Sequence, residues 1–178
     1  MKKIRVTSPV PKNVLAALKA GDQVLLSGTI FTARDAVHKL LVERINKRKA
    51  LPLPLKGISI YYAGPTPAPK GMPIGACGPT TSSRVDAFTP ELLKAGVAAL
   101  IGKGTRSDDV RRAIKRYGAV YFLAIGGAGA FISATIKSSK VVAYKELGPE
   151  AVHRLEVRDM PLIVGIDAGG KDIYGKRR

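Results

Sequence analysis

Apolar positions follow two patterns that alternate along most of the chain. Short runs rich in aliphatic and β-branched residues predict buried strands, and longer stretches with apolar residues at helical spacing predict helices. The expected helices cover 11–21, 34–49, 84–96 and 107–118. The expected strands cover 3–10, 22–33, 58–65, 97–104, 119–131, 140–147, 153–160 and 161–174.

The order of these elements predicts the fold class. Asn13 and Ser107 are the expected N-caps of two helices, and Gly21 and Gly118 are their expected ends. Strands that alternate with helices and are followed by hairpin-like strands indicate an α/β fold with a layered, mixed sheet. The length fits one domain, residues 1–178.

The segment GACGPTTSSRVD, residues 75–86, combines small residues, hydroxyl side chains and an arginine. It closes a long loop at 66–83, and such loops in a compact domain are usually functional or disordered. Residues 80–83 supply hydroxyls, and the guanidinium of Arg84 matches a carboxylate through two hydrogen bonds. Two interpretations stay open: a cradle for an anion, or a polar turn that caps the next helix.

A second cationic group stands where the strand at 22–33 gives way to a helix. Arg34 and His38 are four residues apart and are expected on one helix face. With the free backbone N–H groups of a helix start, they could bind a carboxylate, and His38 could transfer a proton. In the alternative, which the residues alone favour, Arg34 pairs with Asp35 or a surface acid and His38 covers the edge of the core.

Two glycine-containing motifs are weaker signals. Lys103 in IGKG lies at the carboxyl end of an expected strand, a position that suits an anion site in an α/β sheet, although a solvated lysine in a turn is commoner. The spacing of a P-loop is absent, and GGAGAF at 126–131 is a poor match to a dinucleotide loop. One cysteine, Cys77, and two well-separated histidines cannot form a metal site alone.

Charge is the most unusual feature of the composition. The formal net charge is +17 and the pI is about 10.3, which first indicates a polyanionic partner. The basic residues are spread along the chain, however, and aromatic residues make up only 6%, which argues against nucleic acid. The single cysteine suits the cytoplasm, and neither a signal peptide nor a membrane-spanning run is evident.

The motifs SGTIFTARDAVHK, YYAGP, GPTTSSRVD, IGKG and ELGPEAVHRLEVRDMPLIVGIDAGG occur in an order that resembles the β subunit of class I fumarate hydratase and its sister, the L-tartrate dehydratase β subunit. The resemblance covers nearly the whole chain and implies a swivelling β/β/α domain. It also implies an active site shared with a fumarase α subunit, whose own cysteines hold a [4Fe-4S] cluster.

The resemblance assigns roles residue by residue. Arg34 matches an arginine that grips a substrate carboxylate, and Lys103 matches a further carboxylate-binding lysine. Thr80 matches a proposed catalytic base, and His38 matches a second candidate catalytic residue. Substrate-binding positions in the loop are expected at Thr81, Ser82 and Arg84.

The leading hypothesis is therefore a cytoplasmic fumarate hydratase β subunit, inactive alone, in a higher oligomer of αβ pairs that acts on a C4 dicarboxylate. A tartrate or other hydroxy-diacid dehydratase subunit is the alternative within the enzyme class. A non-catalytic, basic nucleic-acid-binding domain is the alternative outside it. The charge is expected to reflect either an acidic α partner or a surface adapted to a hot environment.

Overall fold

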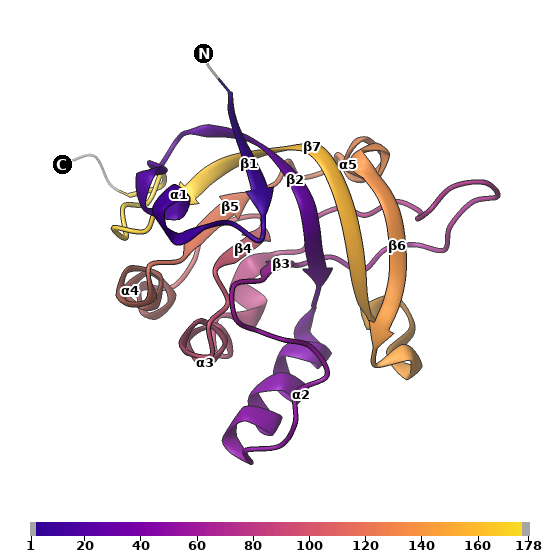
Figure 1. The fold of residues 1–178 in the computed structure, drawn as a ribbon, viewed down its shortest axis with the longest axis horizontal. Helices are drawn as coiled ribbons and strands as arrows, with labels where there is room; N and C mark the ends of the chain where they lie inside the picture. Colours follow the sequence, from indigo (N-terminus) through magenta and orange to yellow (C-terminus); the bar gives the residue numbers. More distant parts are fainter. Residues whose placement is uncertain (1–2, 176–178) are drawn as a thin grey trace.

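Seven strands form one mixed sheet in the computed structural model, which describes residues 3–175 (Figure 1). The strands are β1 (Ile4–Ser8), β2 (Gln23–Thr32), β3 (Ser59–Tyr61), β4 (Ala99–Gly102), β5 (Val120–Leu123), β6 (Ile136–Ala143) and β7 (Val152–Ile166). The helices are α1 (Lys12–Ala17), α2 (Asp35–Asn46), α3 (Thr89–Lys94), α4 (Asp108–Tyr117) and α5 (Gly129–Thr135). Two 3-10 helices, η1 (Ser82–Val85) and η2 (Lys145–Glu150), complete the described elements.

The sheet curls so that β2, near one end, also pairs with β7, near the other. Strands β1 to β5 pair in parallel in the order β1-β2-β3-β4-β5. The long strand β7 then runs antiparallel to β5, to β6 and, across the curl, to β2. As a result, the carboxyl ends of β2, β3, β4 and β5 lie side by side at one edge of the molecule.

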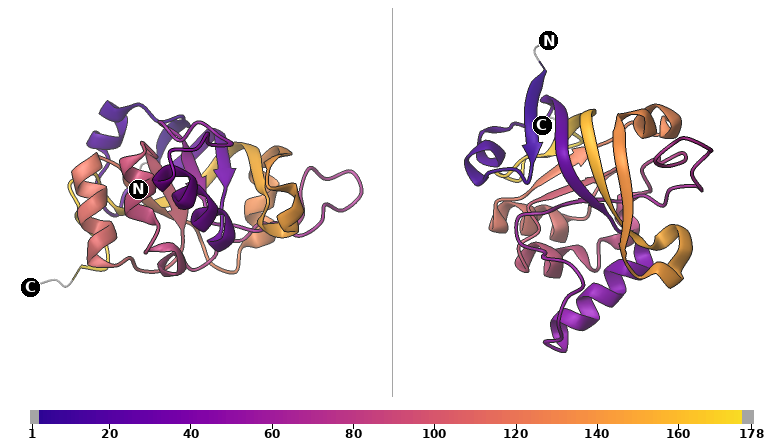
Figure 2. Two further views of the ribbon diagram at one scale, coloured as in Figure 1. Left: turned by 90° about the horizontal axis from the view of Figure 1, so that it is seen from below. Right: turned by 45° about the vertical axis from the view of Figure 1, so that its right-hand side comes forward.

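Alternation along the strands produces two cores and three layers. In β3, Tyr61 faces one hydrophobic cluster and Ile60 faces the other, as the two-residue period of a strand requires. The first cluster lies between β3–β5 and the strands β2 and β7. The second lies between β3–β5 and the helices α2, α3 and α4, which cover one side of the sheet (Figures 1 and 2). The expected α/β class and mixed sheet are confirmed, and the layers follow the order β/β/α.

Capping chemistry explains the best-predicted helix. The side chain of Ser107 accepts a hydrogen bond from the amide of Val110, and Gly118 ends α4 at a φ of 66°. This left-handed conformation favours glycine because it has no Cβ. The prediction for α1 was wrong in detail: Pro11 is its N-cap, and Asn13 lies inside the helix.

The end of the chain departs most from the prediction. Residues 153–174 do not form two strands, because β7 continues through Pro161 with a register shift opposite Leu26–Gly28 and a φ of 50° at Asp159. Strand β6 begins at Ile136, which is buried against β7, and it ends before Tyr144 at a φ of 54°. The expected strand at 119–131 stops at Leu123, and its glycine-rich end turns into α5.

Within residues 3–175, no helix has the length and apolar character needed to cross a membrane.

Candidate active site

The predicted site residues gather at the edge where four parallel strands end. Arg34 follows β2, and Lys103 follows β4. The loop that carries Thr81 lies on the same edge, because Thr81 forms an isolated parallel bridge with Lys103. The next amide, that of Ser82, donates to the carbonyl oxygen of Lys103 at 3.0 Å. In α/β sheets, ligands bind at the carboxyl ends of the strands, so this edge is the candidate site.

Thr80 is fixed to the end of β3 by two hydrogen bonds. Its amide donates to the carbonyl oxygen of Tyr62 at 2.7 Å, and its hydroxyl donates to the same oxygen at 2.9 Å. With the hydroxyl proton directed at Tyr62, the lone pairs of Oγ1 remain available to accept a hydrogen bond. Thr80 is half-buried, whereas Thr81 beside it is exposed.

Arg34 is held against a carboxylate of η2. Its Nη2 atom lies 3.4 Å from Oε1 of Glu150, and Oε2 of Glu150 accepts from the amide of Ala36 at 3.1 Å. The buried Nε of Arg34 has no partner among the described residues. A Cβ at Gly64 would lie 2.8 Å from Nη1 of Arg34, so glycine is required for this close approach. The arginine therefore keeps an unused donor in a tightly packed position.

Arg84 is also paired with a carboxylate. Its Nε lies 3.0 Å from Oδ1 of Asp35, and its side chain is 58% exposed. One alternative from the sequence pairs Arg34 with Asp35 or a surface acid. The pairing with Asp35 is wrong, because Asp35 pairs with Arg84 and Arg34 pairs with Glu150. The two arginines predicted to bind substrate carboxylates both bind carboxylates of the chain itself.

His38 lies beneath the site and not in it. The side chain is buried, with Nδ1 2.8 Å from the carbonyl oxygen of Arg34, and its ring meets Tyr62 edge-on at 5.2 Å. Burial lowers the pKa of His38 to about 4, so the imidazole is neutral near pH 7. Arg34 and His38 were predicted to share a helix face. This is wrong, because Arg34 is the N-cap that precedes α2 and only His38 lies within the helix. His38 therefore contacts the backbone at the site without reaching its surface.

Ser82 is likewise enclosed. Its hydroxyl lies 2.8 Å from the phenol oxygen of Tyr121, and the residue is fully buried. A Cβ at Gly102 would stand 2.1 Å from this hydroxyl oxygen, so the loop packs directly on the backbone of β4. In this structure Ser82 attaches the loop to the sheet and leaves Thr81 and Arg84 on the outside.

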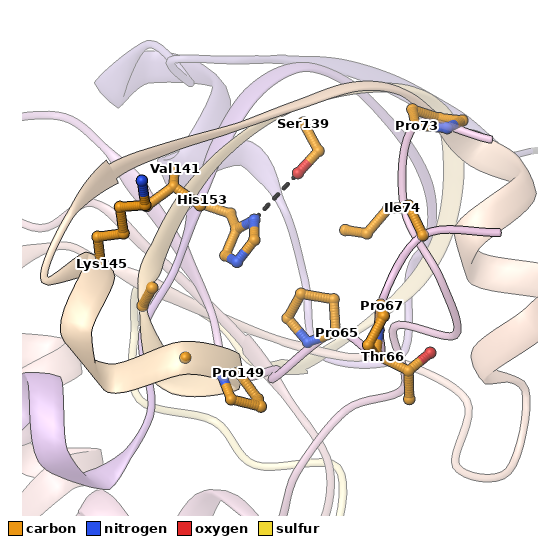
Figure 3. Close-up of a pocket in the computed structure, with 13 residues that line it drawn as sticks. Pro65, Thr66, Pro67, Pro73, Ile74, Ser139, Val141, Lys145, Pro149 and His153 are labelled. Carbon is orange, nitrogen blue, oxygen red and sulfur yellow. Dashed lines mark hydrogen bonds between the residues drawn. The ribbon is translucent and has the colours of Figure 1, made fainter. Parts of the chain in front are cut away.

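Two cavities flank the edge. One, of about 360 Å³, is lined mainly by prolines and aliphatic residues, with His153 at one side (Figure 3). Nδ1 of His153 lies 3.1 Å from the hydroxyl of Ser139, and burial lowers its pKa. None of the predicted site residues lines this cavity, although its Pro65 and Pro149 adjoin Gly64 and Glu150. Lys103 lines a smaller cavity of about 270 Å³.

The described residues do not fit an iron–sulfur cluster. No group of three or more histidine, cysteine, aspartate or glutamate side chains in residues 3–175 could hold a metal ion. Burial raises the pKa of the Cys77 thiol to about 12, whereas a cluster ligand must be a thiolate. A cluster at this edge would have to be bound by residues other than those described.

Comparison with known proteins identifies the family of the chain. A family model described as the fumarase C-terminus matches residues 1–177. The chain belongs to this family. It is 38% identical over 168 residues to the aerobic class I fumarate hydratase of Escherichia coli (strain K12), across 92% of this chain. It is 36% identical over 178 residues to fumarate hydratase 2 of Leishmania major, across 98% of this chain.

Relatives in the fumarase C-terminus family differ in length. The chain spans 31% of the Escherichia coli protein and 31% of the Leishmania major protein. A putative L(+)-tartrate dehydratase subunit beta of Methanocaldococcus jannaschii is 38% identical over 170 residues, which are 92% of this chain and 87% of that protein. The chain therefore corresponds to one part of the longer relatives and to most of the shorter one.

Sequence reasoning missed two charged residues near the loop. Glu150 reaches Arg34 from the far end of the chain, and Arg106 lies buried behind η1. Glu150 lies within the motif ELGPEAVHRLEVRDMPLIVGIDAGG but was given no role, and Arg106 belongs to no quoted motif. Both roles depend on contacts between distant segments.

Proposed function

We propose that this chain is the carboxylate-binding subunit of a class I fumarate hydratase, which adds water reversibly to fumarate to give (S)-malate. The observation that carries the proposal is the gathering of Arg34, Arg84 and Lys103 around two threonine hydroxyls at one edge of the sheet. Several relatives in the family are named class I fumarate hydratase.

A dicarboxylate suits this arrangement because it carries a charge at each end. In the proposed complex, Arg84 binds one carboxylate through its guanidinium, and Lys103 contributes a second cation. Arg34, whose side chain is 22% exposed and is held by Glu150, contributes a third cation. In the transition state for loss of water, negative charge accumulates on a carboxylate, so fixed cations stabilise that state more than the ground state.

Thr80 is the proposed base for the C3 proton. A threonine hydroxyl is a weak base at its ordinary pKa, so its ionisation requires the nearby cations. To take up the C3 proton, Oγ1 must first lose to solvent the proton that it donates to the carbonyl of Tyr62, while the hydrogen bond from the amide of Thr80 to the same carbonyl keeps the residue in place. Thr81 is proposed to bind substrate, while His38 and Ser82 are proposed to position the segments that do so.

The open edge accounts for the need for a partner. We propose that an α subunit covers it and holds the [4Fe-4S] cluster through its own cysteines, which supplies a Lewis acid for the substrate hydroxyl. In this proposal, αβ pairs assemble into a higher oligomer in the cytoplasm. The +17 charge is met in part by an acidic face of the partner.

A tartrate dehydratase is the second candidate. It is favoured by the 87% coverage of the Methanocaldococcus jannaschii protein, whose name designates a tartrate dehydratase subunit. Both candidates use the same cationic edge and differ in the hydroxyl groups of the diacid.

One experiment separates these functions. The chain is copurified with its α partner, the cluster is reconstituted without oxygen, and fumarate absorbance is followed with malate, while tartrate is assayed in parallel. Turnover of malate supports the fumarase and turnover of tartrate supports the alternative. Turnover of neither, together with strong salt-dependent DNA binding, would favour the nucleic-acid-binding domain and overturn the proposal.

A further inference from the structure

Arg106 is the most enclosed cation among the described ion pairs. Its side chain is 0% exposed, and Nε lies 2.7 Å from Oδ1 of Asp86. Nη1 donates to the phenol oxygen of Tyr62 at 3.2 Å, and Nη2 donates to the hydroxyl of Thr89 at 2.7 Å. The guanidinium carbon also lies 5.3 Å from the ring centroid of Tyr62 and 5.0 Å from that of Tyr121. One guanidinium thus contacts four different side chains.

Each of these four residues holds a different point of the segment 80–86, Tyr62 through its backbone carbonyl and the other three through their side chains. Tyr62 accepts both hydrogen bonds of Thr80 through its carbonyl oxygen, and Tyr121 pairs with the hydroxyl of Ser82. The hydroxyl of Thr89 donates to the carbonyl oxygen of Val85 at 2.9 Å. Asp86 is itself the end of the segment, and its second oxygen accepts from the amide of Ser107 at 2.7 Å. The attachments begin at the proposed base and end just beyond Arg84.

We infer that Arg106 is a positioning residue that sets the geometry of the loop carrying Thr80, Thr81 and Arg84. A guanidinium is suited to this role because its donors leave one plane in fixed directions while its faces stack on aromatic rings. A lysine at this position could retain the charge but could not bind three acceptors from three segments in that plane. Arg106 touches no proposed substrate contact, so its effect on the site is indirect.

The inference makes a local prediction in the full chain, independent of catalysis. The amides of Thr80, Ser82, Arg84 and Asp86 are all hydrogen-bonded, to Tyr62, Lys103, Thr81 and Ser83. In Arg106→Lys, hydrogen exchange at these four amides should accelerate at least about tenfold, while the amide of Val120, bonded to Ala98, changes less than about threefold. Arg111→Lys is the matched control, because Arg111 forms an exposed pair with Asp108 on α4.

Milder variants keep the test decisive if Arg106→Lys does not fold. Tyr62→Phe removes only the phenol oxygen that Arg106 binds and keeps the backbone carbonyl that accepts from Thr80, so any loosening of this residue should accelerate exchange chiefly at Thr80. Thr89→Val removes the link to Val85 and should act chiefly at Asp86. Acceleration spread evenly over the sheet, or no acceleration in 80–86, would overturn the inference and reduce Arg106 to a general contribution to stability.

The effect on catalysis rests on the proposed function and is measured in the assembled enzyme. Arg106→Lys should raise KM at least about fivefold through a displaced Arg84 and lower kcat through a displaced Thr80. A role confined to stability would reduce the active fraction and leave KM unchanged, which would contradict the inference. If the wild-type assembly turned over no diacid, the proposed function would fail, whereas the exchange data would still decide the role of Arg106.

Discussion

Arg84 and Asp35 form an ion pair across the candidate site, with Nε and Oδ1 3.0 Å apart, although 49 positions separate them in the chain. The pair joins the loop after β3 to the start of α2. The guanidinium of Arg84 therefore binds a carboxylate at the candidate site, and in this structure that carboxylate is the side chain of Asp35.

Removal of this internal carboxylate should strengthen substrate binding. In Asp35→Asn, the substrate no longer competes with Asp35 for Arg84, so KM should fall about threefold, which corresponds to about 0.6 kcal/mol for a partly exposed pair. Steady-state kinetics of the assembled enzyme measure the change, with Asp108→Asn on α4 as the control. A tenfold rise in KM would instead mean that Asp35 holds Arg84 in its working position.

A methyl group at Gly102 should displace the loop from the sheet. The new Cβ would meet Ser82 Oγ at 2.1 Å and the ring of Tyr62 at 2.7 Å. Gly102→Ala should therefore lower the free energy of unfolding by about 1–3 kcal/mol, as overpacked cores do, and Ser82→Gly in the same chain should restore part of it. Urea denaturation measures both, and Gly126→Ala is the control, since its Cβ has an ordinary 3.6 Å contact. An unchanged midpoint for Gly102→Ala would refute this packing.

The buried His38 should make the fold acid-sensitive. The pKa of this histidine is about 4 in the folded chain and 6.5 in the unfolded chain, so the unfolded state binds more protons between these values. Stability should thus fall as the pH drops from 7 to 4.5, and His38 should account for about 2 kcal/mol of the loss. His38→Phe, which retains an aromatic ring against Tyr62, should lose correspondingly less over this interval in urea titrations. An identical pH dependence in both proteins would contradict the neutral, buried imidazole.

Cys77 should not react while the chain is folded. Its side chain is 0% exposed, and burial raises the pKa of the thiol to about 12, so almost no thiolate exists at pH 8. An aromatic disulfide reagent should label less than about a tenth of the protein in an hour under native conditions and all of it in denaturant. Native labelling at the rate of a free thiol would show that this part of the loop opens.

Local patterns were sufficient to predict most of the fold. Helix α4 carries its own signals in Ser107 and Gly118, and the parallel strands β3 to β5 are short buried runs whose type is encoded locally. The α/β class follows from their alternation with helices. Strand β7 could not be predicted as one element, because a proline inside it is tolerated only through its pairing with β2.

The candidate site was predictable only at its outer surface. Arg34 and Lys103 follow strands, and the loop motif carries Thr80, Thr81 and Arg84, so local reasoning and family resemblance both indicate them. The burial of His38 and Ser82 depends on Tyr62 and Tyr121, which come from other strands. The partners of the arginines and the role of Arg106 also require contacts between segments far apart in the chain.

The central claim is that Arg84 and Lys103 bind the substrate whereas Thr80 removes a proton from it. The separate effects of substitutions on KM and kcat test this claim most directly. In the enzyme assembled with its α subunit and assayed anaerobically, Arg84→Ala and Lys103→Ala should each raise KM at least about tenfold. Thr80→Val, which keeps the shape of the side chain, should lower kcat at least about a hundredfold with little change in KM. Wild-type turnover by Thr80→Val, or unchanged KM values in both cation variants, would contradict the account.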